Sequence, residues 1–347
     1  MVKIIDIKSD TVTMPSLEMR EAMKNAEVGD DFYGEDPTVT KLEQLAAEKL
    51  GKEGGLFVTS GTMGNLISVF THVERGESII VEENAHIFVN EVGHLSSISG
   101  VTPIRIKGQK GFMNPCDIER ELFKDEILYP KTSLICIENP HNDAGGTCIN
   151  TEQMSLLRSL ANKYNLKIHI DGARIFSAGV SLGIEPSKLV KDADSITFCL
   201  TKDLACPFGS LIVGSKDFIL KARKNRQMIG GGMRQAGIMA AAGLIGITKN
   251  VKRLSEDHEN AKLLANNLLK LGFIIDISTV QTNMVYFKLP SKTMDPFDFL
   301  NYLDKYGIKI NPLLNGKFRA VTHFGIKKED IKYILDIIQK YLKKKNK

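Results

Sequence analysis

The sequence lacks the features that mark secreted, zinc-binding and membrane proteins. Its five cysteines are scattered, with no CxxC motif and no cysteine–histidine cluster, which favours a reducing compartment over a disulfide scaffold or a zinc site. No apolar run approaches the roughly 18 residues of a membrane span, and charged residues appear almost at once after Met1. We therefore expect a soluble cytoplasmic protein with no membrane partner.

Signals for nucleic-acid and nucleotide binding are also scarce. The net charge of +5 comes partly from the lysine-rich tail at 343–347, so it describes one end of the chain rather than a binding face. Neither a Walker loop nor a GxGxxG fingerprint is present. We expect no nucleic-acid partner, and we find no internal repeat or Pro/Gly-rich linker.

Alternating patterns dominate the region from about residue 56 to residue 215. Short apolar runs rich in valine and isoleucine alternate there with helical stretches, which is typical of an α/β protein with a mainly parallel sheet. Asn150 and Gln153 form a plausible capping pair for one of the helices. The strand-like runs are 56–58, 78–81, 134–137 and 168–170.

The pattern changes after residue 230. An alanine-rich helix at 236–248 precedes a second helix that Gly272 is placed to end. A strand-like run at 284–287 and a last helix complete a smaller α+β unit. We predict an N-terminal segment and large domain over 1–250 and a small C-terminal domain over 251–347.

Two strand ends carry the most informative pair of residues. Asp171 ends one apolar run, and Lys202 follows the next run, 196–200. If these strands pair in parallel, the carboxylate can neutralise a heterocyclic nitrogen cation while the amine reaches a carbonyl on the same ring. That combination describes a pyridoxal phosphate (PLP) site with a lysine Schiff base. Partial desolvation would lower the pKa of the Lys202 amine and activate it.

A second segment fits the phosphate of such a cofactor. The chain at 56–65 runs from a strand through a glycine-containing turn into an apolar helix. Amides at a helix N-terminus bind anions, and the hydroxyl of Ser60 or Thr62 can add a contact. The triple glycine before Met233 would let Arg234 approach the same phosphate, although a flexible connector gives the same pattern.

Arginine and histidine side chains are the candidates for binding an amino-acid substrate. Arg174 and Arg319 could hold its carboxylate, with surface salt bridges as the alternative. His86 and His141 each follow the carboxyl end of a strand, where ligands bind in open α/β sheets. Either imidazole could stack on the ring or accept a proton from a substrate hydroxyl, or could simply be a loop histidine.

Taken together, these segments resemble a known family. From Asp6 to about Lys340 the chain is similar to the low-specificity L-threonine aldolases, which are fold-type I PLP-dependent lyases. The motifs that carry the resemblance are 8–13, 29–38, 60–62, 85–88, 169–174, 197–202, 230–235 and 319–323.

The resemblance implies a role for each matching residue. Lys202 binds the cofactor as a Schiff base, Asp171 pairs with the ring nitrogen, His86 stacks on the ring, and Gly61 and Thr62 bind phosphate. Ser9, Arg174 and Arg319 hold the substrate carboxylate, while His86 and His141 lie near the β-hydroxyl. Tyr33 and Arg234 are residues that family members contribute across a subunit interface, and members are typically homotetramers.

The implied reaction is retro-aldol cleavage of L-threonine or L-allo-threonine to glycine and acetaldehyde, as part of amino-acid metabolism. The base for the β-hydroxyl is His86, His141 or a bound water, and the sequence leaves this open. A β-eliminating PLP lyase of the same fold is the alternative, and no metal site is expected. The chain departs from the family at Asp203, where glycine usually follows the lysine, and at Lys8, which replaces arginine.

Overall fold

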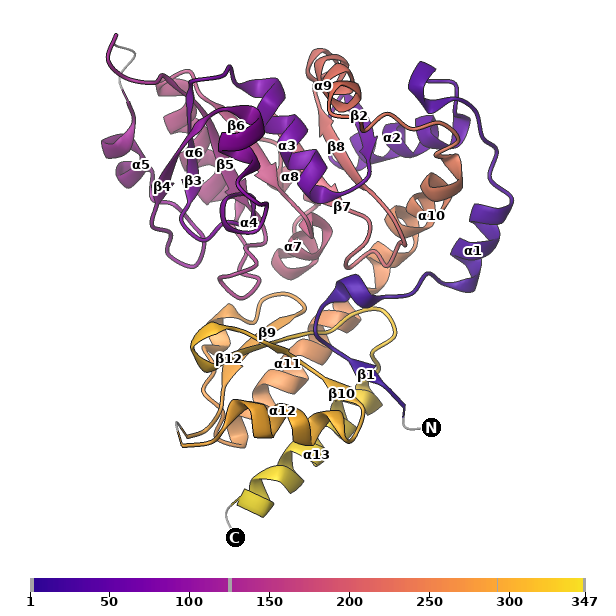
Figure 1. Ribbon diagram of the computed structural model, residues 1–347, viewed down its shortest axis with the longest axis vertical. Coiled ribbons are helices and arrows are strands. Elements are labelled where there is room, and N and C mark those ends of the chain that lie inside the picture. Colours follow the sequence, from indigo (N-terminus) through magenta and orange to yellow (C-terminus); the bar gives the residue numbers. More distant parts are fainter. Residues whose placement is uncertain (1–2, 124–126, 292, 346–347) are drawn as a thin grey trace.

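A seven-stranded sheet lies in the larger, upper part of the protein as drawn in Figure 1. The structure is a computed structural model that describes residues 3–123, 127–291 and 293–345. All neighbouring strands pair in parallel except β8, which is antiparallel to β2 and β7. The predicted α/β class with a mainly parallel sheet is therefore confirmed. In spatial order the strands are β2 (Gly54–Val58), β8 (Ser210–Gly214), β7 (Ser195–Cys199), β6 (Lys167–Asp171), β5 (Thr132–Glu138), β3 (Ser78–Glu82) and β4 (Thr102–Ile106).

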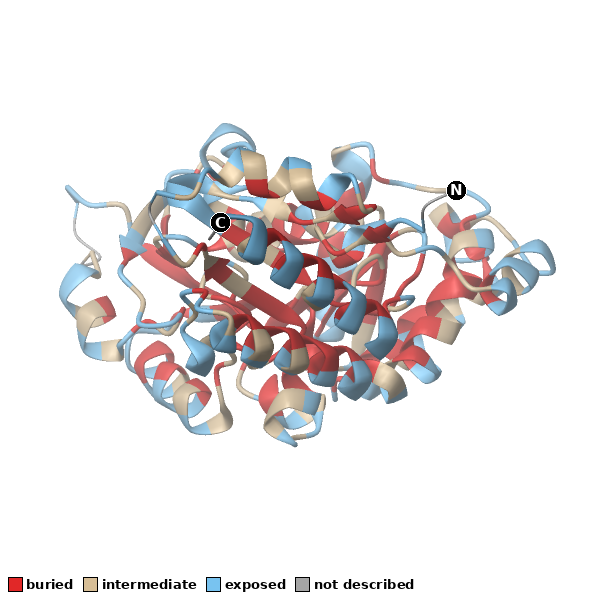
Figure 2. Ribbon diagram, turned by 90° about the horizontal axis from the view of Figure 1, so that it is seen from below, coloured by how far each residue is buried: buried red, intermediate tan, exposed pale blue. Residues whose placement is uncertain are grey.

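Helices cover both faces of this sheet, and each turns its buried side inward (Figure 2). Residues of α3 and α9 pack on the face that carries Leu56, and residues of α2, α6 and α10 pack on the face that carries Phe57. Side chains of successive strand residues point to opposite faces, so the central strands are apolar on both sides. The helices are α1 (Leu17–Lys24), α2 (Pro37–Lys49), α3 (Gly61–His72), α4 (His86–Val89), α5 (Pro115–Glu121), α6 (Thr151–Lys163), α7 (Ile175–Leu182), α8 (Pro186–Leu189), α9 (Lys216–Met228) and α10 (Gly237–Thr248).

Local signals set several of the helix boundaries. Asn150 and Gln153 form the predicted capping box at the start of α6, each side chain bonding the other residue's backbone N–H. Gly272 follows α11 (Leu254–Lys270) with φ of +87°, a conformation that glycine adopts without strain. Both capping predictions are confirmed.

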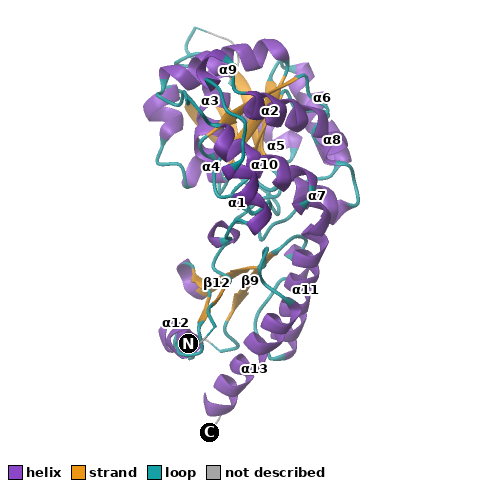
Figure 3. Ribbon diagram, turned by 90° about the vertical axis from the view of Figure 1, so that its right-hand side faces the viewer, coloured by secondary structure: helices purple, strands orange, loops and turns teal. Residues whose placement is uncertain are grey.

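The C-terminal part forms a second hydrophobic core around a small antiparallel sheet (Figure 3). Its strands are β11 (Asn311–Pro312), β12 (Lys317–Val321) and β9 (Met284–Lys288), in that order. The helices α11, α12 (Pro296–Asp304) and α13 (Lys328–Lys345) supply apolar residues to this core. In the lysine-rich tail, Lys345 pairs with Asp298 at 2.8 Å, and residues 346–347 lie outside the described part.

The N-terminal strand packs with this C-terminal core rather than with the large sheet. β1 (Ile5–Asp6) pairs in parallel with β10 (Ile308–Lys309), and Ile5 and Ile7 are buried among the residues of the second cluster. A division of the chain near residue 250 stays a prediction, and residues 5–7 pack with the later unit. No helix in the described ranges is both long and apolar enough to cross a membrane.

The packing of Ile7 predicts a measurable contribution to stability. Replacing Ile7, which is fully buried, with alanine should lower the free energy of unfolding by about 2–5 kcal/mol because a cavity is left in the second core. Ile4→Ala is the matched control, since 63% of Ile4 is exposed. Urea unfolding followed by circular dichroism measures both variants, and equal losses would contradict this packing.

Candidate active site

Chemically active side chains meet at the carboxyl edge of the parallel strands. β3 ends at Glu82, β5 at Glu138 and β6 at Asp171, and Lys202 follows the end of β7 by three residues. The predicted parallel pairing of β6 with β7 is confirmed, with Asp171 opposite Thr197. Because parallel strands present their carboxyl ends at one edge, the sheet gathers these groups where open α/β folds bind ligands.

Asp171 is a buried carboxylate with few partners. Its Oδ2 accepts a hydrogen bond from Asn65 Nδ2 at 2.9 Å, and its Oδ1 accepts one from the Ala173 N–H at 3.2 Å. Burial raises the pKa of Asp171 to about 6, and the charges of Glu138 and Glu91 act in the same direction. A carboxylate held in this state is stabilised by any cation placed against it.

Lys202 is half-buried near this carboxylate. Burial favours the neutral amine, but the neighbouring Cys199 and the carboxylates of Asp171 and Asp10 outweigh it, so the pKa of Lys202 is raised. The prediction of a lowered pKa at this lysine is therefore wrong. The apolar strand before Lys202 suggested desolvation, and only the fold brings the opposing negative groups around the amine.

His86, the first residue of α4, is held by a buried glutamate. Its Nδ1 bonds Glu91 Oε1 at 2.7 Å, while its backbone N–H donates to Glu138 Oε2. Glu91 also accepts hydrogen bonds from His94 and Asn65, each at 2.8 Å. Burial would raise the pKa of Glu91, but the three side-chain hydrogen bonds lower it to about 2.

The hydrogen bond with Glu91 determines which ring nitrogen of His86 is available to a ligand. The hydrogen bond that His86 Nδ1 donates to Glu91 raises the pKa of His86 against the opposing effect of burial. Because Nδ1 is engaged, Nε2 is the ring nitrogen left free of a partner among the described residues. Ligand atoms of His86, Glu91 and Asp171 lie within 4.8 Å of one another, but they bond each other or Asn65.

His141 lies deeper in the wall of the site than His86 does. It is 1% exposed, its Nε2 lies 3.0 Å from Glu82 Oε2, and its Nδ1 accepts the N–H of Ala144 at 3.2 Å. Burial lowers the pKa of His141, but the charge of Glu138 and the hydrogen bond to Glu82 raise it overall. Both ring nitrogens are therefore occupied, unlike those of His86.

The helix N-terminus predicted for phosphate binding lies beside the same edge. Ser60 caps α3 by accepting the N–H of Met63 at 3.1 Å, which leaves the amides of Gly61 and Thr62 available. A Cβ on Gly61 would lie 2.8 Å from Cys199 Sγ and 3.8 Å from Ser210 Oγ. The buried Ser210 hydroxyl has no hydrogen-bond partner among the described residues.

Arg234 and Tyr33 lie together on the surface, apart from the buried residues of the site. The guanidinium of Arg234 bonds Asp30 at 2.7 Å and stands 5.8 Å from the ring centroid of Tyr33, of which 70% is exposed. Gly231, in the triple-glycine segment, packs against Met63 in the first turn of α3. The segment thus approaches the phosphate end, while the arginine side chain points to solvent.

Arg174 is buried in an ion pair with Asp10. Its Nε and Nη2 donate to the two carboxylate oxygens at 2.5 and 2.6 Å. Ser9 precedes Asp10, to which its hydroxyl donates at 3.4 Å. Burial raises the pKa of Asp10, but Arg174 outweighs that effect and lowers it to about 2. This bidentate pair leaves Nη1 of Arg174 for another ligand.

Arg319 reaches the site from the C-terminal sheet. Its Nη1 donates to Asn142 Oδ1 at 3.1 Å and its Nη2 to the Lys8 carbonyl at 3.3 Å, whereas its buried Nε has no partner among the described residues.

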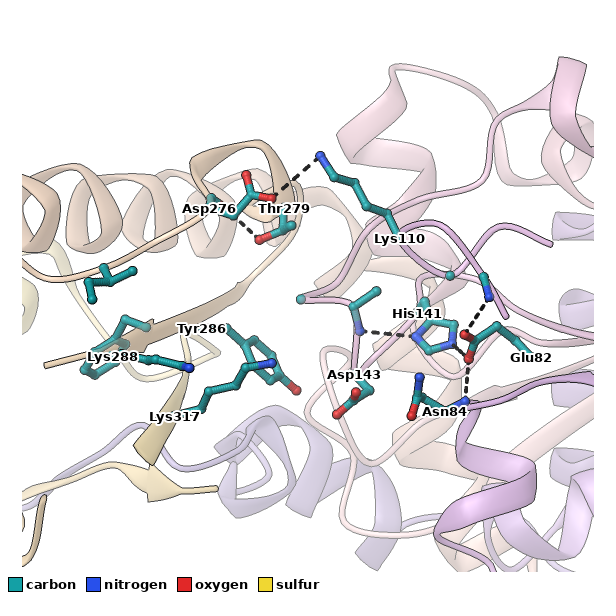
Figure 4. Close-up of a pocket in the computed structure, with 16 residues that line it drawn as sticks. Glu82, Asn84, Lys110, His141, Asp143, Asp276, Thr279, Tyr286, Lys288 and Lys317 are labelled. Atoms are coloured by element: carbon teal, nitrogen blue, oxygen red, sulfur yellow. Dashed lines mark hydrogen bonds and ion pairs between the residues drawn. The ribbon is translucent and has the colours of Figure 1, made fainter. Parts of the chain in front are cut away.

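A cavity of about 400 Å³ opens between the two sheets. Figure 4 shows Tyr286 and Lys317 reaching toward the wall that contains His141.

Asp203 turns away from the lysine that precedes it. The carboxyl is 1% exposed, and Oδ2 accepts a hydrogen bond from Ser177 Oγ at 2.8 Å. Burial and the charge of Asp10 raise the pKa of Asp203 to about 7. Asp203 is therefore bonded to Ser177, and among the described residues it makes no hydrogen bond to Lys202.

The sequence reasoning missed Glu91, Asn65 and Ser210. Ser210 lies directly opposite Cys199 in the β7–β8 pairing, a relation that the fold sets. Asn65 stands out as an amide inside an apolar helix at the cofactor end. Glu91 carries no comparable local signal, because its importance comes from a loop that returns its carboxylate to the sheet edge.

Comparisons with known proteins agree with the geometry. The beta-eliminating lyase family model matches residues 6–290. A probable low-specificity L-threonine aldolase 2 of Arabidopsis thaliana is 42% identical, covering 98% of this chain and 97% of its own. A low specificity L-threonine aldolase of Escherichia coli K12 is 39% identical, covering 94% of this chain and 96% of its own.

The solved structures agree at the level of the fold. A Leishmania major threonine aldolase superposes with a TM-score of 0.83 at 18% identity, over 97% of this chain and 99% of its own. A putative aromatic amino acid beta-eliminating lyase/threonine aldolase of Exiguobacterium gives a TM-score of 0.81 at 17% identity, over 96% of each chain. With its strand-end acid and lysine in place, the chain belongs to the beta-eliminating lyase family and is a relative of the low-specificity L-threonine aldolases.

Proposed function

We propose that this protein is a PLP-dependent lyase that cleaves L-threonine and L-allo-threonine to glycine and acetaldehyde. The observation that carries the proposal is the convergence of Asp171 and Lys202 at adjacent strand ends, beside the free amides that begin α3. The names of the aldolase relatives, which match this chain over nearly its whole length, support the substrate.

The side chains present fit the cofactor. The amides of Gly61 and Thr62 and the unpartnered hydroxyl of Ser210 form a place for a phosphate, and Gly61 leaves room for close approach. Asp171 is a buried carboxylate without a cationic hydrogen-bond partner, which a protonated ring nitrogen would supply. When bound through Lys202, PLP provides the electron sink for breaking the Cα–Cβ bond.

Arg174 and Arg319 are the groups that would hold the substrate carboxylate. Arg174 has Nη1 left over from its pair with Asp10, and Arg319 has a buried Nε with no partner among the described residues. Ser9 stands beside Asp10 and can add a hydroxyl contact. Two guanidinium groups fix the orientation of a carboxylate, and orientation decides which bond at Cα breaks.

His86 is the proposed base for the β-hydroxyl. Its Nε2 is free to accept the hydroxyl proton, and Glu91 at Nδ1 stabilises the imidazolium that results. His141 has both ring nitrogens engaged, so we assign it to positioning the wall of the cavity through Glu82 and Ala144.

A β-eliminating reaction is the second candidate function, because the family whose model matches this chain is described as a beta-eliminating lyase. The two reactions differ at Cβ. Aldol cleavage requires removal of the hydroxyl proton and releases an aldehyde, whereas elimination expels the hydroxyl and leads to ammonia and a keto acid. The free Nε2 of His86 favours the first reaction.

The assembly and location of the protein are also proposed. We infer a cytoplasmic homotetramer in which Tyr33 and Arg234 reach the site of a neighbouring subunit. The exposure of Tyr33 and the outward direction of Arg234 support this, because neither contributes to the site of its own chain. The five cysteines are all unpaired, as in proteins of a reducing compartment.

Loss of Lys202 should abolish the reaction. Purified holoenzyme should release acetaldehyde and equimolar glycine from both diastereomers, and Lys202→Ala should release neither because no amine binds the cofactor. Lys270→Ala, at an exposed helix end, is the matched control and should retain full activity. Ammonia and keto acid in place of acetaldehyde would establish the eliminating lyase instead.

Glu91→Gln should change the pH dependence of the reaction. Activity that depends on neutral His86 is lost as the pH falls through the raised pKa of this residue. Removing the charge of Glu91 lowers that pKa, so the acid limb of kcat/KM should move down by about one pH unit while kcat falls. His94→Gln keeps the Glu91–His86 bond and should leave the limb in place. An unmoved limb in Glu91→Gln would rule out His86 as the titrating base.

Mixed oligomers test the shared site. Lys202→Ala and Arg234→Ala should each be inactive alone, but subunits dissociated and reassociated together should regain about a quarter of wild-type activity, because half of the dimers then contain one intact site. Each variant taken alone through the same procedure is the control. Absence of recovery would mean that Arg234 acts within its own chain.

A further inference from the structure

A line of polar side chains runs beneath α3, along the face of the sheet that holds Asp171. Asn65, Ser68 and His72 share one face of the helix because they are spaced by three and four residues. Beneath them, β6 presents His169 and β7 presents Ser195 and Thr197. We call these six residues the polar seam.

The seam divides the hydrophobic core on this face. Val69 of α3 packs in one cluster with residues of β3 and β5, while Ile67 packs in another with residues of β2 and β8. On the opposite face, by contrast, a single cluster includes residues of every strand of the large sheet and of the helices above them. Burying polar groups costs free energy unless every one is hydrogen-bonded, so a seam in this position calls for an explanation.

Hydrogen bonds link the seam into a chain that ends on Asp171. His72 Nε2 lies 2.7 Å from Ser195 Oγ, which lies 2.8 Å from His169 Nδ1. His169 Nε2 lies 3.2 Å from Asn65 Oδ1, and Asn65 Nδ2 donates to Asp171 Oδ2 at 2.9 Å. The chain follows α3 from Asn65 to His72, a distance of about 10 Å along the helix.

The carboxylate at its end fixes the direction of every bond in the chain. Ionised Asp171 only accepts, so Asn65 donates its amide hydrogen and turns its oxygen to His169. His169 must then carry its proton on Nε2, and its Nδ1 accepts from Ser195. The Ser195 oxygen in turn accepts from Nε2 of His72. Every donor points toward Asp171.

Both imidazoles are suited to this arrangement because they stay neutral. Burial lowers the pKa of His169 to about 3 and that of His72 to about 4. His72 also stacks on Phe218, with ring centroids 4.4 Å apart, at the edge of a cavity lined by Lys52 and Asp194. The chain therefore begins at the end of the sheet opposite the proposed cofactor.

We propose that this hydrogen-bonded chain holds Asp171 ionised and correctly oriented for the cofactor ring nitrogen, with His169 and His72 as positioning residues. Aligned donors strengthen one another in a low-dielectric interior, so even His72 acts on the carboxylate. The proposal rests on the role assigned above to Asp171, and it adds residues that never touch cofactor or substrate.

The first test measures protonation in the intact holoenzyme by ¹⁵N NMR of labelled histidine side chains between pH 5 and pH 9. His72 and His169 should remain neutral throughout, each with its proton on Nε2, whereas His86 should titrate. Titration of either seam histidine in this range, or a proton on Nδ1 of His169, would overturn the proposal.

The second test compares two substitutions at His72. His72→Phe keeps the ring that stacks on Phe218 but removes the donor to Ser195, and His72→Gln restores an N–H donor. His72→Phe should weaken PLP retention about five-fold, as expected for one net hydrogen bond, and should shift the pH dependence of the cofactor absorbance. His72→Gln should stay close to the wild type.

These readouts separate the seam from the reaction itself. Equal PLP retention in His72→Phe and the wild type, or an equal loss in His72→Gln, would contradict the proposal, with thermal unfolding midpoints checking that both variants fold. Neither measurement uses aldehyde release. Failure of the enzyme to cleave threonine would contradict the aldolase proposal without affecting the proposal about the seam. Failure of these tests would contradict the proposal about the seam without affecting the aldolase proposal.

Discussion

The parallel alignment of β3, β5, β6 and β7 is the constraint on which the site depends. Parallel pairing places the carboxyl ends of these strands at one edge. Three of the strands end in a carboxylate residue, and Lys202 follows the end of β7. A single reversed strand would remove its acid from the edge. The antiparallel β8 shows the difference, since it brings the start of its strand, Ser210, to the edge where we propose that phosphate binds.

Gathering acids in this way creates an electrostatic problem that the surrounding residues solve. Glu82, Glu138, Glu91 and Asp171 lie close together and largely buried. His141 bonds the first, the amides of His86 and Asn142 bond the second, and two histidines with Asn65 bond the third. Asp171 accepts hydrogen bonds from the neutral donors Asn65 and Ala173, and burial raises its pKa, so a cation placed beside it would be stabilised.

The N-terminal segment connects the two cores across the site. Ile5 and Ile7 are anchored in the C-terminal core, and three residues later Asp10 pairs with Arg174, which lies between β6 and α7. Arg319 bonds the Lys8 carbonyl and Asn142, so it also contacts both sides. The two arginines proposed to bind the substrate carboxylate are therefore positioned by contacts between units, and a change in how the units pack would move them relative to Lys202.

The sequence by itself indicated the fold class, many of the elements and a set of candidate reactive groups. Periodicity and capping residues predicted strands such as 78–81 and 168–170 and the start of α6, because these signals are local, whereas β4 and β8 were not predicted. The order of motifs pointed to Lys202, Asp171 and His86 as a set. Only the tertiary structure decided how these groups are tuned. The raised pKa of Lys202, the occupied nitrogens of His141, the pairing of Glu91 with His86 and the seam beneath α3 all depend on charges and donors from distant segments, whose distances no local pattern encodes.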